Sequence, residues 1–115
     1  MARTDVATQE MTFPGLLPTY TAPVVDGDIV DVGRTFLSVI NGGAASINVE
    51  VITPGVVDGD LAIANRIVAV PVGTTPTLIP LTSTQYRQPV GSADAGRAYV
   101  DYSDVTSVTR AVVSL

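Results

Sequence analysis

Short runs of alternating apolar and polar residues recur along the chain from residue 24 onward. Residues 46–53 (SINVEVIT) place an apolar side chain at every second position: Ile47, Val49 and Val51. A period of two predicts a β-strand with one buried face. Residues 35–40 (TFLSVI) form another such run, and Asn41-Gly42-Gly43 separates the two. Because asparagine and glycine tolerate positive φ angles, this spacing predicts a β-hairpin.

Proline restricts the secondary structure that two further runs can adopt. Residues 66–70 (RIVAV) lie in a stretch whose spacing a helix could also use, but their Val and Ile content next to Pro71 favours a strand. Residues 75–82 (TPTLIPLT) contain Pro76 and Pro80. Since proline cannot donate a ladder hydrogen bond, a strand there must be short or lie at the edge of a sheet.

The end of the chain predicts a closing pair of strands. Residues 97–103 (RAYVDYS) and 107–115 (SVTRAVVSL) are joined by a short connection, and residues 88–96 (QPVGSADAG) predict a loop before them. The chain contains no convincing amphipathic helix and no glycine-rich phosphate-binding motif after a strand. We therefore predict an all-β fold for residues 24–115, a small antiparallel β-sandwich or barrel of about six to seven strands.

Residues 1–23 differ from the rest and predict an extended, proline-rich N-terminal arm. Three prolines and a glycine exclude a stable helix or central strand over residues 12–23. The arm nevertheless carries four large apolar side chains: Phe13, Leu16, Leu17 and Tyr20. A solvated linker would not need them. They are the candidate interface residues, either in a strap over the protein's own core or in an arm that docks on a neighbouring subunit.

The pentapeptide VVDGD occurs twice, at residues 24–28 and 56–60. A calcium loop of the EF-hand type needs glycine at its sixth position and glutamate at its twelfth. Counted from Asp26, these positions hold Asp31 and Leu37, and the second copy is followed directly by apolar residues. Asp-Gly is a common turn dipeptide. We interpret both copies as one turn used twice, each leading into a strand, and we expect no metal and no cofactor.

The composition restricts the available chemistry. The chain has 115 residues, the size of one domain, and it contains no cysteine, no histidine and no lysine. A nucleophilic site would therefore lack its usual bases. Paired carboxylates leave glycoside hydrolysis open, but the chain has no Trp, four Tyr and two Phe to stack on sugars. We expect no catalytic residues and no enzymatic activity.

The charge and hydropathy patterns exclude two classes of partner. The net charge is −5 without a basic cluster, which argues against nucleic acid and against anionic lipid surfaces. No apolar run approaches the ~20 residues of a membrane-spanning helix. Asp5 and Glu10 stand where a signal peptide would need its apolar stretch. We expect the protein to be made in the cytoplasm, with no nucleic-acid and no membrane partner.

Four motifs together resemble a group of small virion proteins of tailed phages that infect actinobacteria. They are a Gly-Arg-Thr-Phe-Leu run, an Asn-Gly-Gly turn, a Thr-Pro-Gly-x-Val-Asp-Gly turn and a Tyr-Val-Asp-Tyr run, here Gly33 to Leu37, Asn41 to Gly43, Thr53 to Gly59, and Tyr99 to Tyr102. The N-terminal MARTDVATQEMT is similar as well, so the resemblance extends over most of the chain. The motifs are structural rather than catalytic.

The resemblance implies a capsid decoration or minor capsid protein. Such a protein binds the outside of the major capsid shell and stabilises it, so its expected location is the virion surface. The expected partners are the major capsid protein and further copies of the chain, as a homo-oligomer that is a dimer or a trimer. The alternatives are a tail or head–tail connector component and, more remotely, a small carbohydrate-binding module, against which the shortage of aromatic residues argues.

Overall fold

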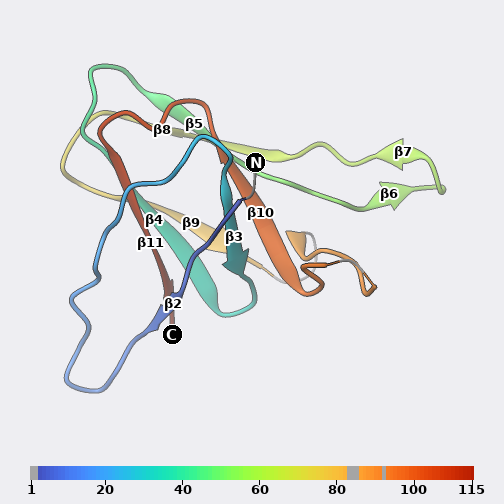
Figure 1. The fold of residues 1–115 in the computed structure, drawn as a ribbon, viewed down its shortest axis with the longest axis horizontal. Helices are drawn as coiled ribbons and strands as arrows, with labels where there is room; N and C mark the ends of the chain where they lie inside the picture. The colour runs from blue at the N-terminus through green and yellow to red at the C-terminus, as the bar shows by residue number, and fades with distance from the viewer. Residues whose placement is uncertain (1–2, 83–85, 92) are drawn as a thin grey trace.

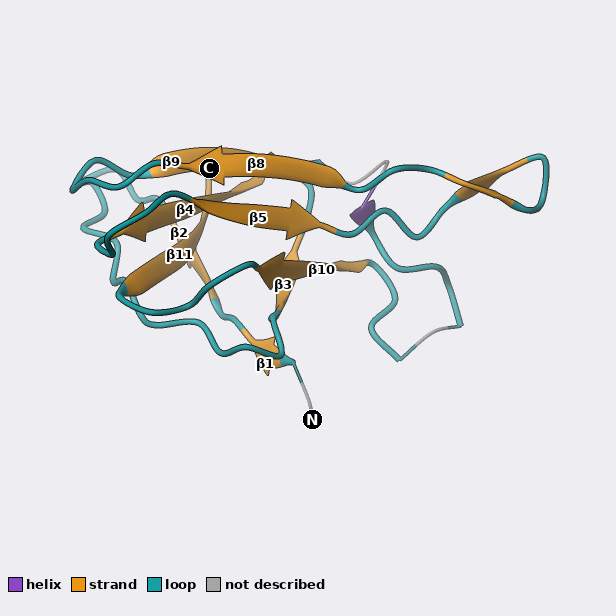
Figure 2. Ribbon diagram, turned by 90° about the horizontal axis from the view of Figure 1, so that it is seen from above, coloured by secondary structure: helices purple, strands orange, loops and turns teal. Residues whose placement is uncertain are grey.

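The computed structural model describes residues 3–82, 86–91 and 93–115. These residues form an all-β fold with almost no helix, in which two sheets pack as a small sandwich (Figures 1 and 2). In spatial order, the five-stranded sheet consists of β1 (Thr4–Asp5), β3 (Asp28–Asp31), β10 (Arg97–Tyr102), β5 (Ile47–Val51) and β8 (Arg66–Val70). The four-stranded sheet consists of β2 (Thr8–Glu10), β11 (Val108–Ser114), β4 (Thr35–Asn41) and β9 (Thr77–Leu81).

A separate two-stranded hairpin projects from the body of the sandwich (Figure 1). It is formed by β6 (Val56–Val57) and β7 (Leu61–Ala62), which pair in antiparallel orientation. Asn65 holds its base, because its side chain accepts a hydrogen bond from the Thr53 amide at 2.7 Å and donates one to Glu50 at 2.8 Å. The hairpin is therefore anchored where it leaves the five-stranded sheet.

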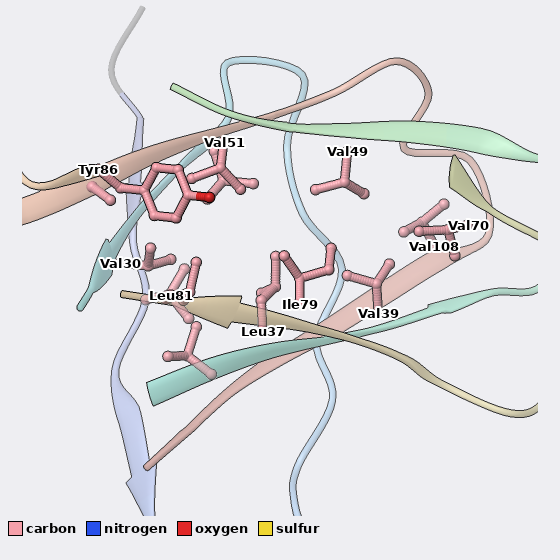
Figure 3. Close-up of a cluster of buried hydrophobic side chains, with 14 of the residues drawn as sticks. Val30, Leu37, Val39, Val49, Val51, Val70, Ile79, Leu81, Tyr86 and Val108 are labelled. Carbon is pink, nitrogen blue, oxygen red and sulfur yellow. The ribbon is translucent and has the colours of Figure 1, made fainter. Parts of the chain in front are cut away.

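The core lies between the two sheets and consists almost entirely of aliphatic side chains (Figure 3). The predicted alternation in β5 is confirmed, since Ile47, Val49 and Val51 are buried while the intervening residues are not. From the opposite sheet, Leu37 and Val39 of β4 are also buried. Branched aliphatic residues pack well on a pleated surface, which explains how a chain so poor in aromatic residues builds a core.

The predicted hairpin between residues 35–40 and 46–53 is wrong. The first run is β4, which pairs with β11 and β9, whereas the second is β5, which pairs with β10 and β8 in the other sheet. Asn41 ends β4 without forming a hairpin turn. Its side-chain amide donates hydrogen bonds to the carbonyls of Ala45 and Val70 at 2.9 and 3.2 Å, and its side-chain oxygen accepts one from the Gly43 amide at 3.0 Å. The glycines after Asn41 have no positive φ. The connection therefore carries the chain across the sandwich.

The predicted closing pair is wrong for the same reason. Residues 97–103 contain β10 of the five-stranded sheet, and residues 107–115 contain β11 of the four-stranded sheet. The alternating pattern identifies a strand and its buried face, but it does not identify the neighbouring strand. In a sandwich, two consecutive strands can lie on opposite sides of one core and bury the same number of side chains as a hairpin.

The other strand predictions are confirmed. β8 spans the predicted residues 66–70, and β9, which contains Pro80, lies at the edge of its sheet. Seven strands of four residues or more match the predicted number, and four shorter strands add to them. The sheets are mixed rather than purely antiparallel, since β1 and β2 each join their sheet in parallel. The predicted 88–96 loop contains one isolated bridge, and its residue 92 lies outside the described residues.

The start of the N-terminal segment belongs to both sheets. β1 lies at the edge of the five-stranded sheet and β2 at the edge of the four-stranded sheet, with the buried side chain of Val6 between them. Arg3 pairs with Asp101 at 2.7 Å, and its guanidinium lies 4.5 Å from the centre of the Tyr99 ring. Residues 3–10 are thus bound to the protein's own body.

Candidate interaction surface

The 12–19 loop follows β2 and projects from the sandwich at the lower left of Figure 1. Hydrogen bonds hold both of its ends. The Gln9 side chain donates to the Thr19 carbonyl and accepts from the Thr19 amide, each at 2.8 Å. At the start of the loop, the Met11 amide donates to the Ser114 carbonyl of β11 at 3.0 Å. Within the loop, the Gly15 amide donates to the Thr12 carbonyl and the Thr12 hydroxyl donates to the Gly15 carbonyl, each at 2.9 Å. The loop is an ordered platform for its apolar side chains.

The four predicted interface residues divide into two pairs. Phe13 and Leu17 project into solvent almost completely. Leu16 and Tyr20 are half-buried against the body, and the Tyr20 hydroxyl is hydrogen-bonded to that of Ser38 at 2.8 Å. Burying a large apolar side chain contributes roughly 1.5–3 kcal/mol. Phe13 and Leu17 gain none of this free energy within the chain. Leu16 and Tyr20, in contrast, fix the loop to the four-stranded sheet.

An apolar groove of about 240 Å³ separates the 12–19 loop from the outer face of the four-stranded sheet. Leu16, Pro18 and Tyr20 line it from the loop side. The sheet contributes three residues that the sequence analysis did not name as interface candidates: Phe36, Leu78 and Val113. Strand alternation could have identified them, because an apolar residue facing away from the core is a signal of a second contact surface. Loop and groove together form one apolar region.

Both VVDGD copies contain a turn that leads into a strand, as predicted, but they are not one turn used twice, since Asp58 has a positive φ angle and Asp26 does not. In the first, the Gly27 amide donates to the Val24 carbonyl at 3.0 Å before β3 begins. In the second, Asp58 and Gly59 have φ angles of 54° and 84° at the tip of the β6–β7 hairpin. Within the described part of the chain, no three His, Cys, Asp or Glu side chains lie close enough together to hold a metal ion.

Asp28, the last residue of the first copy, belongs to a buried ion pair that joins the two sheets. It lies in β3 and is fully buried, and the Arg110 guanidinium of β11 donates to its two oxygens at 2.7 and 2.9 Å. The Tyr102 hydroxyl also donates to this carboxylate, and Arg110 donates to the hydroxyl and the carbonyl of Thr21.

This cluster has the composition of an acid–base site but the surroundings of a structural one. Burial raises the pKa of the Tyr102 hydroxyl far above its ordinary value, and the negative Asp28 carboxylate that accepts its hydrogen bond adds to the effect. Perturbed pKa values often mark functional sites, but structural ion-pair networks produce them as well. Among the described residues, every buried side-chain polar atom has a hydrogen-bond partner. The cluster therefore joins β3 of one sheet to β11 of the other through hydrogen bonds that satisfy its buried polar atoms.

The raised pKa of Tyr102 predicts a specific dependence of stability on pH. Below about pH 10, an ordinary tyrosine pKa, the hydroxyl is protonated in the folded and unfolded states alike, so its ionisation does not affect stability. Above that pH the unfolded state loses the proton and the folded state keeps it, so stability falls by up to about 1.4 kcal/mol per pH unit. Chemical denaturation between pH 9 and about pH 11 measures this slope.

A Tyr102→Phe variant isolates the effect, because the other ionisable groups stay the same. We expect its stability to fall less steeply than that of the unmodified protein above about pH 10. Parallel curves for the two proteins would mean that Tyr102 ionises in the folded state, contrary to the burial described above.

No helix within the described residues has the length and apolar character needed to cross a membrane. Comparison of the chain with models of protein families, with curated proteins and with solved structures finds no match.

Proposed function

We propose that the protein is a structural protein of a tailed-phage virion that binds the outside of the major capsid shell and stabilises it. The 12–19 loop is the main support for this proposal, because it presents Phe13 and Leu17 to solvent from a segment tied at both ends. The motif resemblance described above supports the same role. A binding role of this kind needs a stable body and an exposed contact surface rather than a catalytic site.

The structure of the loop favours binding over mere exposure. Ordering a flexible loop on a partner costs free energy, and a loop already held by hydrogen bonds avoids most of that cost. Aromatic side chains that enter a partner's pocket are frequent hot spots of protein interfaces. In this proposal Phe13 and Leu17 enter the shell, and the neighbouring groove, with the exposed Leu78, receives an apolar side chain from it.

The test is binding of the purified protein to purified capsid shells of the phage that encodes it. The variant combines Phe13→Ala with Leu17→Ala. Anchors of this kind are each worth roughly 2 kcal/mol, so we expect the affinity to fall at least about a hundredfold. The melting temperature should change little, because both side chains are already in solvent in the free protein.

Val90→Ala is the matched control, because Val90 is equally exposed but lies in the 88–96 loop. We expect this variant to bind shells like the unmodified protein. Equal loss of binding in both variants, or unchanged binding in the double variant, would contradict the proposed contact. Binding of the unmodified protein to isolated tails and not to shells would contradict the capsid role itself.

A further inference from the structure

β8 is the one long strand edge that the sandwich leaves open within the described residues. Of the four outer strands of the two sheets, β1 has two residues and β2 has three, while β9 contains Pro80, which removes a backbone donor. β8 has five residues, contains neither proline nor a carboxylate, and lies at the upper margin of its sheet in Figure 2. Short strands, prolines and charged side chains protect exposed sheet edges, and of these β8 has only the exposed Arg66, its first residue.

The register identifies which backbone groups of β8 are free. The Ser103 amide donates to Asn48 and the Ile52 amide donates to Tyr99, so the even-numbered residues of β5 face β10. In an antiparallel ladder the facing direction alternates along the strand. The odd-numbered residues of β5 therefore face β8, where they are paired with residues 66, 68 and 70.

Ile67 and Ala69 consequently point their N–H and C=O groups away from β5, where no other strand among the described residues pairs with them. The free segment ends at Pro71, which has no amide donor, and Val72 after it bridges Asn41 of β4. The backbone groups of Ile67 and Ala69 thus point away from β5, and those of Val68 between them point toward it. This arrangement allows the strand to pair with an antiparallel copy of itself. A second copy, related by a two-fold axis through Val68, can pair Ile67 with Ala69 and Ala69 with Ile67.

The side chains agree with this arrangement. Val68 packs against the core but is only partly buried, because no strand covers it on the open side. On the two-fold axis it would face its own copy, which would extend the core across the contact. On the outer face, the exposed side chain of Ile67 would lie beside the small Ala69 of the second copy. Cross-strand pairs of this kind are what stabilise sheet edges.

We propose that two copies of the chain associate through β8, edge to edge and antiparallel, so that their five-stranded sheets become one continuous sheet. Isologous two-fold contacts are the commonest form of self-association. A five-residue strand is only about 17 Å long. Such a contact is small beside the roughly 800 Å² per partner of a stable complex. The dimer is therefore weak in dilute solution and stronger where many copies are held together.

Cysteine substitution tests the register directly, because the chain contains no cysteine of its own. In the proposed dimer the Cα atoms of the two copies of residue 68 are about 4.5 Å apart, which a disulfide can span. Val68→Cys is therefore expected to become a covalent dimer when a concentrated solution is treated with oxidised glutathione. Ile67→Cys is the matched control, since its two copies lie more than about 7 Å apart and cannot be bridged.

A second variant tests the same contact without a disulfide crosslink. Ala69→Pro removes an amide donor that the monomer does not use, and proline is tolerated on edge strands whose N–H faces solvent. In sedimentation experiments, the average molecular mass of the unmodified protein is expected to rise with its concentration. The variant is expected to stay monomeric and to retain the circular dichroism of a β-protein. Failure of Val68→Cys to crosslink, or equal crosslinking of Ile67→Cys, would overturn the proposal. Neither measurement uses capsid shells, so the outcome is separate from that of the proposed function.

Discussion

Replacing Arg110 with methionine is expected to lower the free energy of unfolding by about 3–5 kcal/mol, the cost of leaving a buried charge without its partner. Arg110 is 3% exposed and its partner Asp28 is fully buried. Without the guanidinium, the Asp28 carboxylate would retain the Tyr102 hydroxyl as a donor but lose the opposite charge. The Thr21 hydroxyl would lose its contact with the guanidinium as well, whereas the Thr21 carbonyl would keep the hydrogen bond from the backbone amide of residue 110 at 2.8 Å.

Urea denaturation followed by circular dichroism measures this loss. Arg97→Met is the matched control, because Arg97 also pairs with acidic side chains, but its partners Asp5 and Asp31 are 71% and 47% exposed and Arg97 itself is 24% exposed. Exposed pairs contribute about 1 kcal/mol or less, since solvent screens them. We expect the Arg110 variant to lose several times more stability than the Arg97 variant. Equal losses of stability would show that the buried ion pair does not contribute more than a surface pair to holding the two sheets together.

A compensated variant separates the cost of the unpaired charge from the value of the pair. Replacing Asp28 with leucine and Arg110 with methionine removes both charges together. Apolar replacements of buried ion pairs are often neutral or stabilising. We expect this double variant to recover most of the stability that the single Arg110→Met substitution loses. If the double variant were less stable than the single one, the pair itself would make a large net contribution.

Gly27→Ala is expected to destabilise the protein by about 3 kcal/mol or more, because the site allows neither the backbone angle nor the volume of an alanine. Its φ angle is +88°, which costs an L-residue roughly 1–2 kcal/mol. A Cβ atom would also lie 2.5 Å from the Val100 carbonyl oxygen, within the central strand β10. Overpacking of this kind typically costs a further 1–3 kcal/mol.

Gly59→Ala provides a matched control in the same chain. Gly59 occupies the equivalent position of the second VVDGD copy and has a similar φ of +84°, but no atom lies within 4 Å of its Cβ position. We expect this substitution to cost only the backbone term, about 1–2 kcal/mol. Thermal and urea denaturation of both variants measure the difference. Similar losses at the two glycines would mean that the close approach of β10 to Gly27 is absent in solution.

Local features of the chain were predictable because their causes are local. The alternation of Ile47, Val49 and Val51 depends only on the two-residue period of a strand, and these three residues are buried as expected. Pro80 limits β9 to an edge because it lacks an amide hydrogen. The two Asp-Gly turns follow from the backbone preferences of their own residues. For the interface, the apolar content of the arm was visible, but the division into exposed and half-buried residues was not.

The sequence by itself determined the fold class, most long strands, their buried faces and the turns, since a few neighbouring residues encode each of them. Only the tertiary structure decided which strands pair, because β4 and β5 would bury the same alternating residues whether they lay side by side in one sheet or in opposite sheets. It also brought Asp28 to Arg110, 82 residues away, and distinguished two identical pentapeptides by what packs against them. Such features depend on contacts between distant segments. The free energy of those contacts comes from the whole core and is not determined by any one segment.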